Sequence, residues 1–342
     1  MRDLLARRPT RLVERRIYGA NLVVQIGIVV TGGLVHLTES GLGCPTWPDC
    51  VPGSVFPVPD QAQGWHKLIE FGNRLLTYVV VAAVVLALWA AWRRRPRRQA
   101  LVGLAAVQVL GVFAQAILGG ITVLTRLNPA AVAGHFLLSM VLVAFAAYLY
   151  QRSGQGDGPP RRVVRRELVA MGFGLSALGA LILMVGTVVT GSTPQRANGM
   201  ILTRFPFSPR EVAWLHADLA VLLTGLSIGL ALAVRVSDAP RPARRVADLM
   251  VGVIIVQAAI GYFQYFTHLP VAAVDLHMLG ASLLVTVLVR VVTTLRVRDP
   301  EPAWDGVDPQ GPAVVGRRPA PDDTLPHPGS APAGGRSAAG TR

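Results

Sequence analysis

Eight long apolar blocks dominate the sequence and leave few folds open to it. They cover approximately residues 17–37, 68–92, 99–123, 130–150, 168–190, 212–234, 247–267 and 271–295. Each block has close to the roughly 20 residues that an α-helix needs to cross the hydrocarbon core of a bilayer. Of the 342 residues, 52% are hydrophobic and only 15% are charged, more apolar surface than a soluble protein of this size could bury. The blocks therefore predict an all-α membrane protein with eight transmembrane helices in a lipid bilayer.

The positive charge is concentrated in alternate connections between these blocks. The net charge is +14, and arginines cluster in residues 8–16, 93–98, 161–166 and 241–245. The intervening connections carry few positive charges, which is the pattern of a membrane protein with basic cytoplasmic loops. The distribution argues against a nucleic-acid partner. It predicts that both termini lie in the cytoplasm and that the loops near 38–67, 125–130, 191–211 and 268–271 face outward.

The chain contains two copies of one design. The segment QAILGGITVLTRLNPAAVAGH (115–135) aligns without gaps on QAAIGYFQYFTHLPVAAVDLH (257–277), and VVTGG (29–33) matches VVTGS (188–192). Four spans per copy give both copies the same orientation, which predicts two tandem four-helix bundles related by a pseudo-two-fold axis along the membrane normal. The predicted organisation is a cytoplasmic N-terminus (1–16), an N-terminal bundle (17–150), a basic cytoplasmic linker (151–167), a C-terminal bundle (168–298) and a disordered cytoplasmic tail (299–342).

Four histidines fall near the outer starts of the even-numbered blocks. We expect His66, His135, His216 and His277 in the first turns of their helices, the last three roughly 5–10 Å below the outer boundary. Facing imidazoles in a four-helix bundle can hold a haem iron from both sides. A zinc site is less favoured, because no local cluster offers three or four ligands. His216 and His277 are the predicted ligands of one b-type haem, unless all four are structural, hydrogen-bonded histidines.

The second apolar block begins with polar side chains that a lipid-embedded helix seldom carries. In WHKLIEFGNR (65–74), His66, Glu70 and Arg74 are four residues apart and share one helix face, with Asn73 close by. One interpretation is a local ion pair between Glu70 and Arg74. The other directs Glu70 at a haem pocket, as a carboxylate that handles protons or positions the substrate.

The chain has two cysteines, Cys44 and Cys50, and both lie in the predicted outer segment TESGLGCPTWPDC (38–50). Disulfides persist on that side of the membrane. The pair is either a structural staple of a small loop or a redox-active pair beside an active site, and the sequence leaves both open. The glycines and prolines of the segment predict that the first helix ends here and that the chain folds back over the mouth of the bundle.

These features together resemble a known family. The segment GGLVHLTESGLGCPTWPDC (32–50), the E-x-x-N-R stretch at 70–74 and the repeated histidines are similar to bacterial haem A synthase, over roughly residues 15–295. The resemblance implies an oxidoreductase of the bacterial cell membrane that oxidises the C8 methyl of haem O to a formyl group. The product, haem A, would serve terminal oxidase assembly. A haem O synthase (farnesyltransferase) and oxidase assembly factors are partners that the pathway implies, and a homo-oligomer is compatible with it.

The resemblance also assigns roles to individual residues. It implies that His216 and His277 hold haem b in the C-terminal half and that His135 faces the substrate haem O in the N-terminal half. Glu70 matches the family's catalytic carboxylate, and the pocket for the substrate haem would include His66, Asn73 and Arg74. Cys44 and Cys50 match the family's disulfide or redox pair.

One departure from the family concerns the first haem. Many members carry histidine where this chain has Asn73, and His66 lies seven residues earlier, about 10 Å along the helix. Either His135 holds this haem alone, or the helix is shifted and His66 takes part. Two other functions compete with the resemblance: a di-haem b-type electron-transfer protein linked to quinones, and a transporter built from parallel repeats.

Overall fold

The computed structural model describes residues 10–94, 97–197 and 199–298, and within these ranges it confirms the eight predicted helices. They are α2 (Arg11–Leu37), α3 (His66–Arg93), α4 (Gln99–Leu124), α5 (Pro129–Ser153), α6 (Arg166–Ser192), α7 (Pro209–Val236), α8 (Arg241–Phe266) and α9 (Val271–Leu295). Each is long and apolar enough to cross a membrane, with mean hydropathies from 1.7 to 2.3. The predicted tail, residues 299–342, lies outside the described residues.

Polar caps set the starts of several helices, so these starts do not coincide with the apolar blocks. The side chain of Thr10 accepts a hydrogen bond from the backbone N–H of Val13 at the start of α2. The side chains of Asn128 and Ser208 cap α5 and α7 in the same way, and each is followed by a proline at the first helical position. As a result α2 and α7 begin several residues before the hydropathy predicts.

Helices α4 and α8 end in the same kind of turn. Arg126 and Leu127 have φ angles of 53° and 58°, and His268 and Leu269, at the aligned positions of the repeat, have φ angles of 62° and 60°. Such values are uncommon for residues other than glycine. The shared turn therefore supports the internal repeat from the backbone, independently of the residue identities. It also gives His268 a local role, as the residue that turns the chain toward α9.

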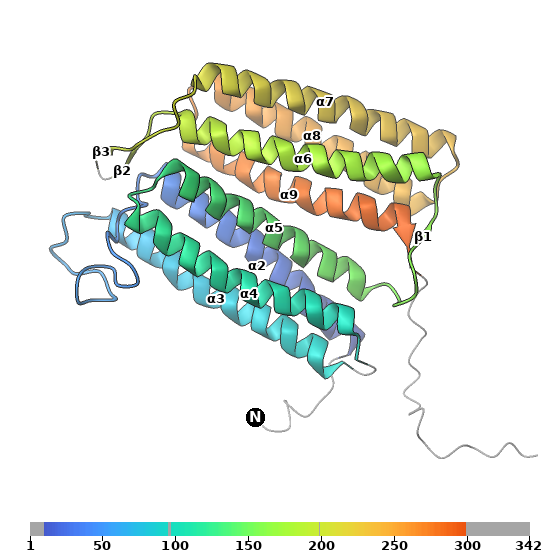
Figure 1. Ribbon diagram of the computed structural model, residues 1–342, viewed down its shortest axis with the longest axis horizontal. Coiled ribbons are helices and arrows are strands. Elements are labelled where there is room, and N and C mark those ends of the chain that lie inside the picture. Colours follow the sequence, from blue (N-terminus) through green and yellow to red (C-terminus); the bar gives the residue numbers. More distant parts are fainter. Residues whose placement is uncertain (1–9, 95–96, 198, 299–342) are drawn as a thin grey trace, which may run out of the picture. The chain divides into compact units, whose positions relative to one another are not determined.

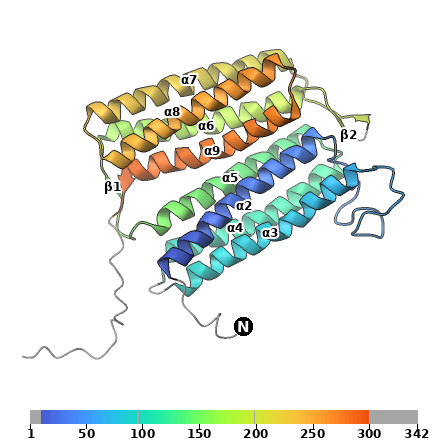
Figure 2. The same cartoon turned by 180° about the vertical axis from the view of Figure 1, so that it is seen from behind.

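The helices pack in two groups of four (Figure 1). In one group α2, α3, α4 and α5 each contact the next and α5 closes onto α2, and α6, α7, α8 and α9 do the same. Helix α9 also packs on α2 and α5, as the view from behind shows (Figure 2). Val29, Met140, Val143 and Val285 form an apolar cluster at this junction. The pseudo-two-fold axis and the domain boundaries stay predictions.

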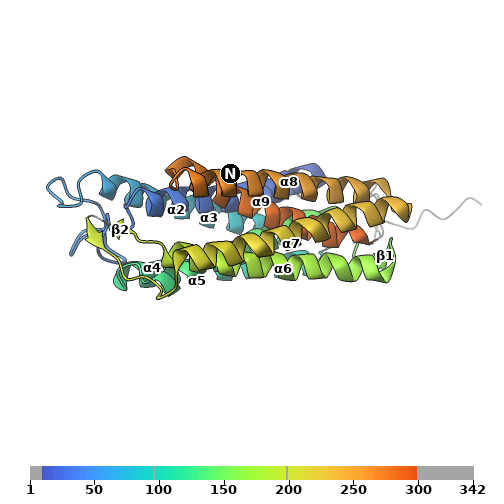
Figure 3. The same cartoon turned by 90° about the horizontal axis from the view of Figure 1, so that it is seen from above.

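Short strands lie at both ends of the helices. At one end β1 (Arg161–Arg162) pairs antiparallel with β4 (Arg296–Val297), and at the other β2 (Arg196–Ala197) pairs with β3 (Met200–Ile201). Figure 3 shows β1 and β2 at these opposite ends. The β1 end carries the basic connections. The β2 end carries the cysteine segment and the turns before the candidate histidines, so the site described below lies at that end.

Candidate functional site

Two imidazoles from diagonal helices face each other in the second group of helices. The ring centres of His216 on α7 and His277 on α9 are 6.3 Å apart, with an angle of 60° between the ring planes. The Nδ1 atom of each ring is buried, and no described residue gives it a hydrogen bond. Polar atoms buried without a partner are costly in a lipid-embedded site. Each ring also lies against the backbone of an adjoining helix, at Ile182 of α6 for His216 and at Gln257 of α8 for His277. The two rings are thus held by their neighbours while they face each other, an arrangement that suits a shared ligand.

Glycines on the adjoining helices make room for these rings. A Cβ atom at Gly186 of α6 would lie 3.1 Å from Cε1 of His216, and one at Gly261 of α8 would lie 3.3 Å from Cε1 of His277. A glutamine then links α8 to α9, because Nε2 of Gln257 donates a hydrogen bond of 2.7 Å to the carbonyl oxygen of His277. The repeated glycine and glutamine thus set the position and the height of the imidazole.

The first group of helices repeats half of this arrangement. A Cβ atom at Gly119 of α4 would lie 3.2 Å from Cε1 of His135 on α5. Nε2 of Gln115 donates to the carbonyl oxygen of His135 at 3.0 Å and to Oγ of Ser139 at 2.6 Å. The Nδ1 atom of His135 is also buried, and no described residue bonds to it. His135 is therefore prepared in the same way as His277.

The donor set fits haem iron better than it fits a structural metal. Among the described residues no group of three or more His, Cys, Asp or Glu side chains could hold a metal ion. The 6.3 Å between the ring centres of His216 and His277 leaves room for one metal between them, since two metal–nitrogen bonds of about 2 Å each, plus the radii of the rings, add up to about that distance. The facing rings and the glycine contacts agree with this use.

The helical turn that carries three of the histidines differs from the expectation. His66 is the first residue of α3, as expected, but His135, His216 and His277 lie in the second turns of their helices. The expectation of a first-turn position was wrong for these three, because the helix starts lie more than one turn before them. Six residues after Val271, for example, His277 is about 9 Å along the helix axis. The three residues still lie near the same end of their helices, the end that carries β2 and β3.

Helix α3 does not present a second imidazole at this depth. Asn73 lies at this depth instead, and its Oδ1 accepts a hydrogen bond of 2.8 Å from Oγ1 of Thr31. His66 lies at the start of the helix, with Nδ1 3.0 Å from Oγ of Ser40 and its ring stacked on Trp65 at 4.0 Å between centres. These contacts engage His66 with the outer loop.

A comparison of α2 with α6 shows that α2 has a glycine with no ring packed against it. The alignment of VVTGG with VVTGS places Gly27 on Gly186, the glycine that touches His216. A Cβ atom at Gly27 would meet nothing within 4 Å. The first group thus keeps the notch for a ring, but no ring of α3 occupies it. This asymmetry distinguishes the two halves.

Glu70 joins α3 to the cysteine segment. Its side chain is buried, 6% exposed, and Oε2 accepts a hydrogen bond of 2.8 Å from the backbone N–H of Cys44. Oε1 pairs with Nη2 of Arg74 at 2.7 Å, so the predicted local ion pair is present. Among the described residues the only other buried carboxylate is Glu14 near the opposite end of the helices. Among the described residues Glu70 is therefore the buried acid at the end that carries the disulfide.

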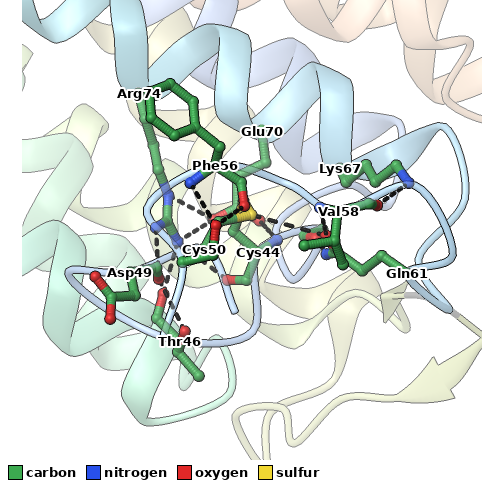
Figure 4. Close-up of a disulfide and its surroundings, with 12 residues drawn as sticks. Cys44, Thr46, Asp49, Cys50, Phe56, Val58, Gln61, Lys67, Glu70 and Arg74 are labelled. Atoms are coloured by element: carbon green, nitrogen blue, oxygen red, sulfur yellow. Dashed lines mark hydrogen bonds and ion pairs between the residues drawn. A yellow bond between two sulfur atoms is a disulfide. The ribbon is translucent and has the colours of Figure 1, made fainter. Parts of the chain in front are cut away.

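The guanidinium group of Arg74 holds the cysteine segment in place (Figure 4). Besides pairing with Glu70, it donates hydrogen bonds to four backbone carbonyl groups of the loop. The acceptors are the oxygens of Cys44 and Thr46, each at 3.0 Å, of Asp49 at 3.3 Å and of Pro48 at 3.4 Å. The planar fork of an arginine suits such a set of acceptors. The spacing of residues in the sequence gave no signal for this role.

The disulfide and a tryptophan complete a cap over the first group of helices. Cys44 and Cys50 form the disulfide, and both residues are fully buried. The loop that they close presses Trp47 against α4, where a Cβ atom at Gly120 would lie 2.5 Å from the indole. Gly120 follows Gly119, the glycine beside His135. The segment therefore folds back over the mouth of the bundle, as predicted, next to the candidate haem position.

Comparisons with known proteins agree with this arrangement. A model of the family described as cytochrome oxidase assembly protein matches residues 15–289. A relative from Shewanella oneidensis, named heme A synthase, is 26% identical over 324 aligned residues, which cover 79% of this chain and 93% of the relative. A heme A synthase from a Caulobacter species is 25% identical, and the alignment covers 77% of this chain and 90% of that protein.

A more similar but shorter match is found in Lysinibacillus sphaericus. That protein, also named heme A synthase, is 38% identical over 124 residues. The alignment covers 36% of this chain and 38% of the relative, so it spans well under two thirds of that protein. The two longer alignments are therefore the ones that bear on the chain as a whole.

Proposed function

This chain belongs to the cytochrome oxidase assembly protein family, and from that premise we propose that it is a haem A synthase. The proposed reaction is the oxidation of the C8 methyl group of haem O to a formyl group, which gives haem A. The observation that carries the proposal is the pair of facing imidazoles, His216 and His277, whose rings lie 6.3 Å apart between diagonal helices. A multi-pass membrane protein with such a pair is suited to an apolar porphyrin.

The two halves take different tasks in this proposal. His216 and His277 hold haem b, which when bound supplies one-electron transfer near the outer surface. His135 holds haem O in the first half, beside the notch at Gly27. Asn73 cannot serve as a strong iron ligand, and His66 is bonded to Ser40 in the outer loop. We therefore assign His135 as the one protein residue that would hold the substrate iron.

Glu70 is the residue we assign to proton handling. It is the buried carboxylate at the outer end and lies against the cap through the N–H of Cys44. The change from a methyl to a formyl group takes up one oxygen atom from water and releases four protons and four electrons. The electrons would leave through haem b to an external electron acceptor, and a buried carboxylate is a side chain that can accept protons. Arg74 keeps the carboxylate in position, and the cap limits the access of bulk water to the mouth of the bundle. A redox role for the disulfide stays a prediction.

The location follows from the two ends of the helices. We propose that the protein lies in the bacterial cell membrane with the β1–β4 end in the cytoplasm and the disulfide end outside. The arginine clusters support this orientation because cytoplasmic loops are enriched in Lys and Arg. The disulfide supports it because such bonds persist outside the cytoplasm. A haem O synthase would then deliver the substrate within the same membrane.

The test is expression of the full chain in cells that supply haem O, followed by mass analysis of the extracted haems. We expect haem A or its hydroxylated precursor from the wild type and neither from Glu70→Gln. His216→Ala and His277→Ala should each change the Soret band of the bound haem b. His268→Asn, a change in a turn at the same end, is the matched control and should alter neither measurement.

Two results would oppose the proposal. Unchanged haem O together with two permanently bound haems would favour a di-haem electron-transfer protein. A preparation without haem absorbance would remove the haem assignment altogether. The single-ligand assignment has its own test, because the spectrum of the haem O complex should be unchanged by His66→Ala and lost with His135→Ala.

A further inference from the structure

A cavity of about 620 Å³ lies at the end of the helices opposite to the histidines. It is formed where α4 begins and α5 ends, and Arg298, the residue after β4, lies at its rim. The lining residues are Arg97, Arg98, Gln99, Ala100, Gly103, Leu104, Tyr148, Arg152, Asp157 and Arg298. The volume is in the range of sites that bind small molecules. The haem proposal uses none of these residues.

The lining is strongly cationic. Four of its members are arginines, and Asp157 is the one acidic residue among the lining residues that the structure describes. Oδ1 of Asp157 lies 2.7 Å from Nη2 of Arg98 and 3.4 Å from Nη2 of Arg152. One carboxylate thus serves two guanidinium groups whose side chains are only 2% and 4% exposed, while its own side chain is 52% exposed. The described lining residues therefore carry an excess of about three positive charges, four arginines against one aspartate.

The beginning of α4 adds to this field. Gln99 and Ala100, the first two residues of the helix, line the cavity, and the N-cap residue Arg98 makes no side-chain hydrogen bond to this turn. The first N–H groups of a helix carry partial positive charge and bind anions well. On the side toward the membrane the wall is formed by Gly103, Leu104 and Tyr148. The cavity thus joins a basic rim to a wall without charge.

We propose that this cavity binds a phosphate group. Arginines hold phosphate oxygens in paired, charge-assisted hydrogen bonds, and basic pockets between transmembrane helices on the cytoplasmic side are typical of anionic headgroups. The phosphate belongs either to an anionic phospholipid, whose chains would run along Gly103 and Leu104, or to a soluble phosphate compound. The carboxylate of Asp157 pairs with Arg98 and Arg152 and therefore competes with the phosphate for these two side chains.

The test uses the purified full chain in a neutral detergent. One arm measures retention of phosphatidylglycerol over phosphatidylcholine by native mass spectrometry, and the other measures binding of inorganic phosphate by equilibrium dialysis. Arg97→Gln and Arg298→Gln each remove one cation from the rim and should weaken binding roughly tenfold. Arg241→Gln, at the start of α8, makes the same charge change on the repeat-equivalent helix and should have no effect.

Two more variants keep the test decisive where removal of an arginine disturbs folding. A Cβ atom at Gly103 would meet nothing within 4 Å, so Gly103→Leu should fold and narrow the groove without changing any charge. We expect it to reduce lipid retention and to leave inorganic phosphate binding unchanged. Asp157→Asn removes the competing carboxylate and should tighten phosphate binding severalfold.

The outcomes separate the two sources. Retention of phosphatidylglycerol that falls in the rim variants and in Gly103→Leu supports a lipid headgroup. Binding of inorganic phosphate with the same rim dependence and no preference among lipids supports a soluble phosphate. The proposal is overturned if neither ligand binds, or if Arg241→Gln lowers binding as much as the rim variants do.

Discussion

Replacing Arg74 should open the cysteine segment while the helices stay folded. Its guanidinium group pairs with Glu70 at 2.7 Å and donates to four loop carbonyl groups at 3.0–3.4 Å. Cys44 and Cys50, whose disulfide closes the loop, are fully buried. A reductant therefore reaches the disulfide only after the loop has moved away from α3, so the rate of reduction reports how often the loop opens.

The size of the effect follows from the contacts. Breaking a buried ion pair by removing one partner costs 3–5 kcal/mol, and the side chains of Arg74 and Glu70 are 22% and 7% exposed. Because Arg74 is partly solvated, we take the lower value, about 3 kcal/mol, as the loss in Arg74→Gln. Each 1.4 kcal/mol is a tenfold change, so the open population should rise roughly 100-fold. Arg74→Lys keeps the positive charge but loses the planar guanidinium group, and we expect the open population to rise roughly tenfold.

The assay is reduction of the purified protein by a phosphine, followed over time by labelling of the released thiols. Arg126→Gln, a change of an exposed arginine in the next outer loop, is the matched control. Circular dichroism should show the same helix content in all variants. If Arg74→Gln is reduced within twofold of the control rate, the guanidinium contacts do not hold the loop closed, and the reasoning fails.

Three further predictions rest on single contacts. Gly120→Ala should lower the free energy of unfolding by about 1–3 kcal/mol, because the added methyl group would press on Trp47. The measurement is the unfolding temperature, followed by fluorescence. The control is Gly225→Ala, where a Cβ atom meets nothing within 4 Å, and it should leave the unfolding temperature unchanged. Gln257→Leu removes the hydrogen bond to the carbonyl of a ligand histidine and should weaken haem b retention by roughly tenfold at most, measured as haem per protein; equal retention would contradict a positioning role. Burial acts to raise the pKa of Asp157, but hydrogen bonds and charge from neighbouring arginines outweigh it and lower this pKa. Its stabilisation is therefore present above the ordinary carboxyl pKa and is lost as the pH falls below about 4, and Asp157→Asn should show a smaller drop in unfolding temperature over that range.

The helices could be predicted from the sequence because a lipid environment leaves so few alternatives. A segment that spans the hydrocarbon core must satisfy its own backbone, so long apolar blocks become helices. Their ends were less predictable. Helix α8 begins at Arg241 rather than near residue 247 because the hydrocarbon core does not limit how far a helix extends into water. The repeat was visible because the residues that touch the imidazoles are the same in both halves.

The cap could be predicted only in outline. The two cysteines predict a disulfide, and the spacing of Glu70 and Arg74 predicts their ion pair, because both are local in sequence. The four carbonyl contacts of Arg74 depend on the path of the loop between residues 44 and 50, which no periodicity encodes. The contact of Trp47 with Gly120 links segments far apart in the chain, and a single sequence carries no signal for such a pair.

The adjacent glycines of α4 have a consequence for how this protein can vary. Successive positions on an α-helix point about 100° apart, so Gly119 and Gly120 serve two separate partners, the imidazole and the indole. Inserting or deleting one residue earlier in α4 would rotate Gly119 away from the imidazole and Gly120 away from the indole at the same time. The contacts of α4 with Trp47 of the cap and with His135 thus depend on one helical phase, and a single insertion would disturb both.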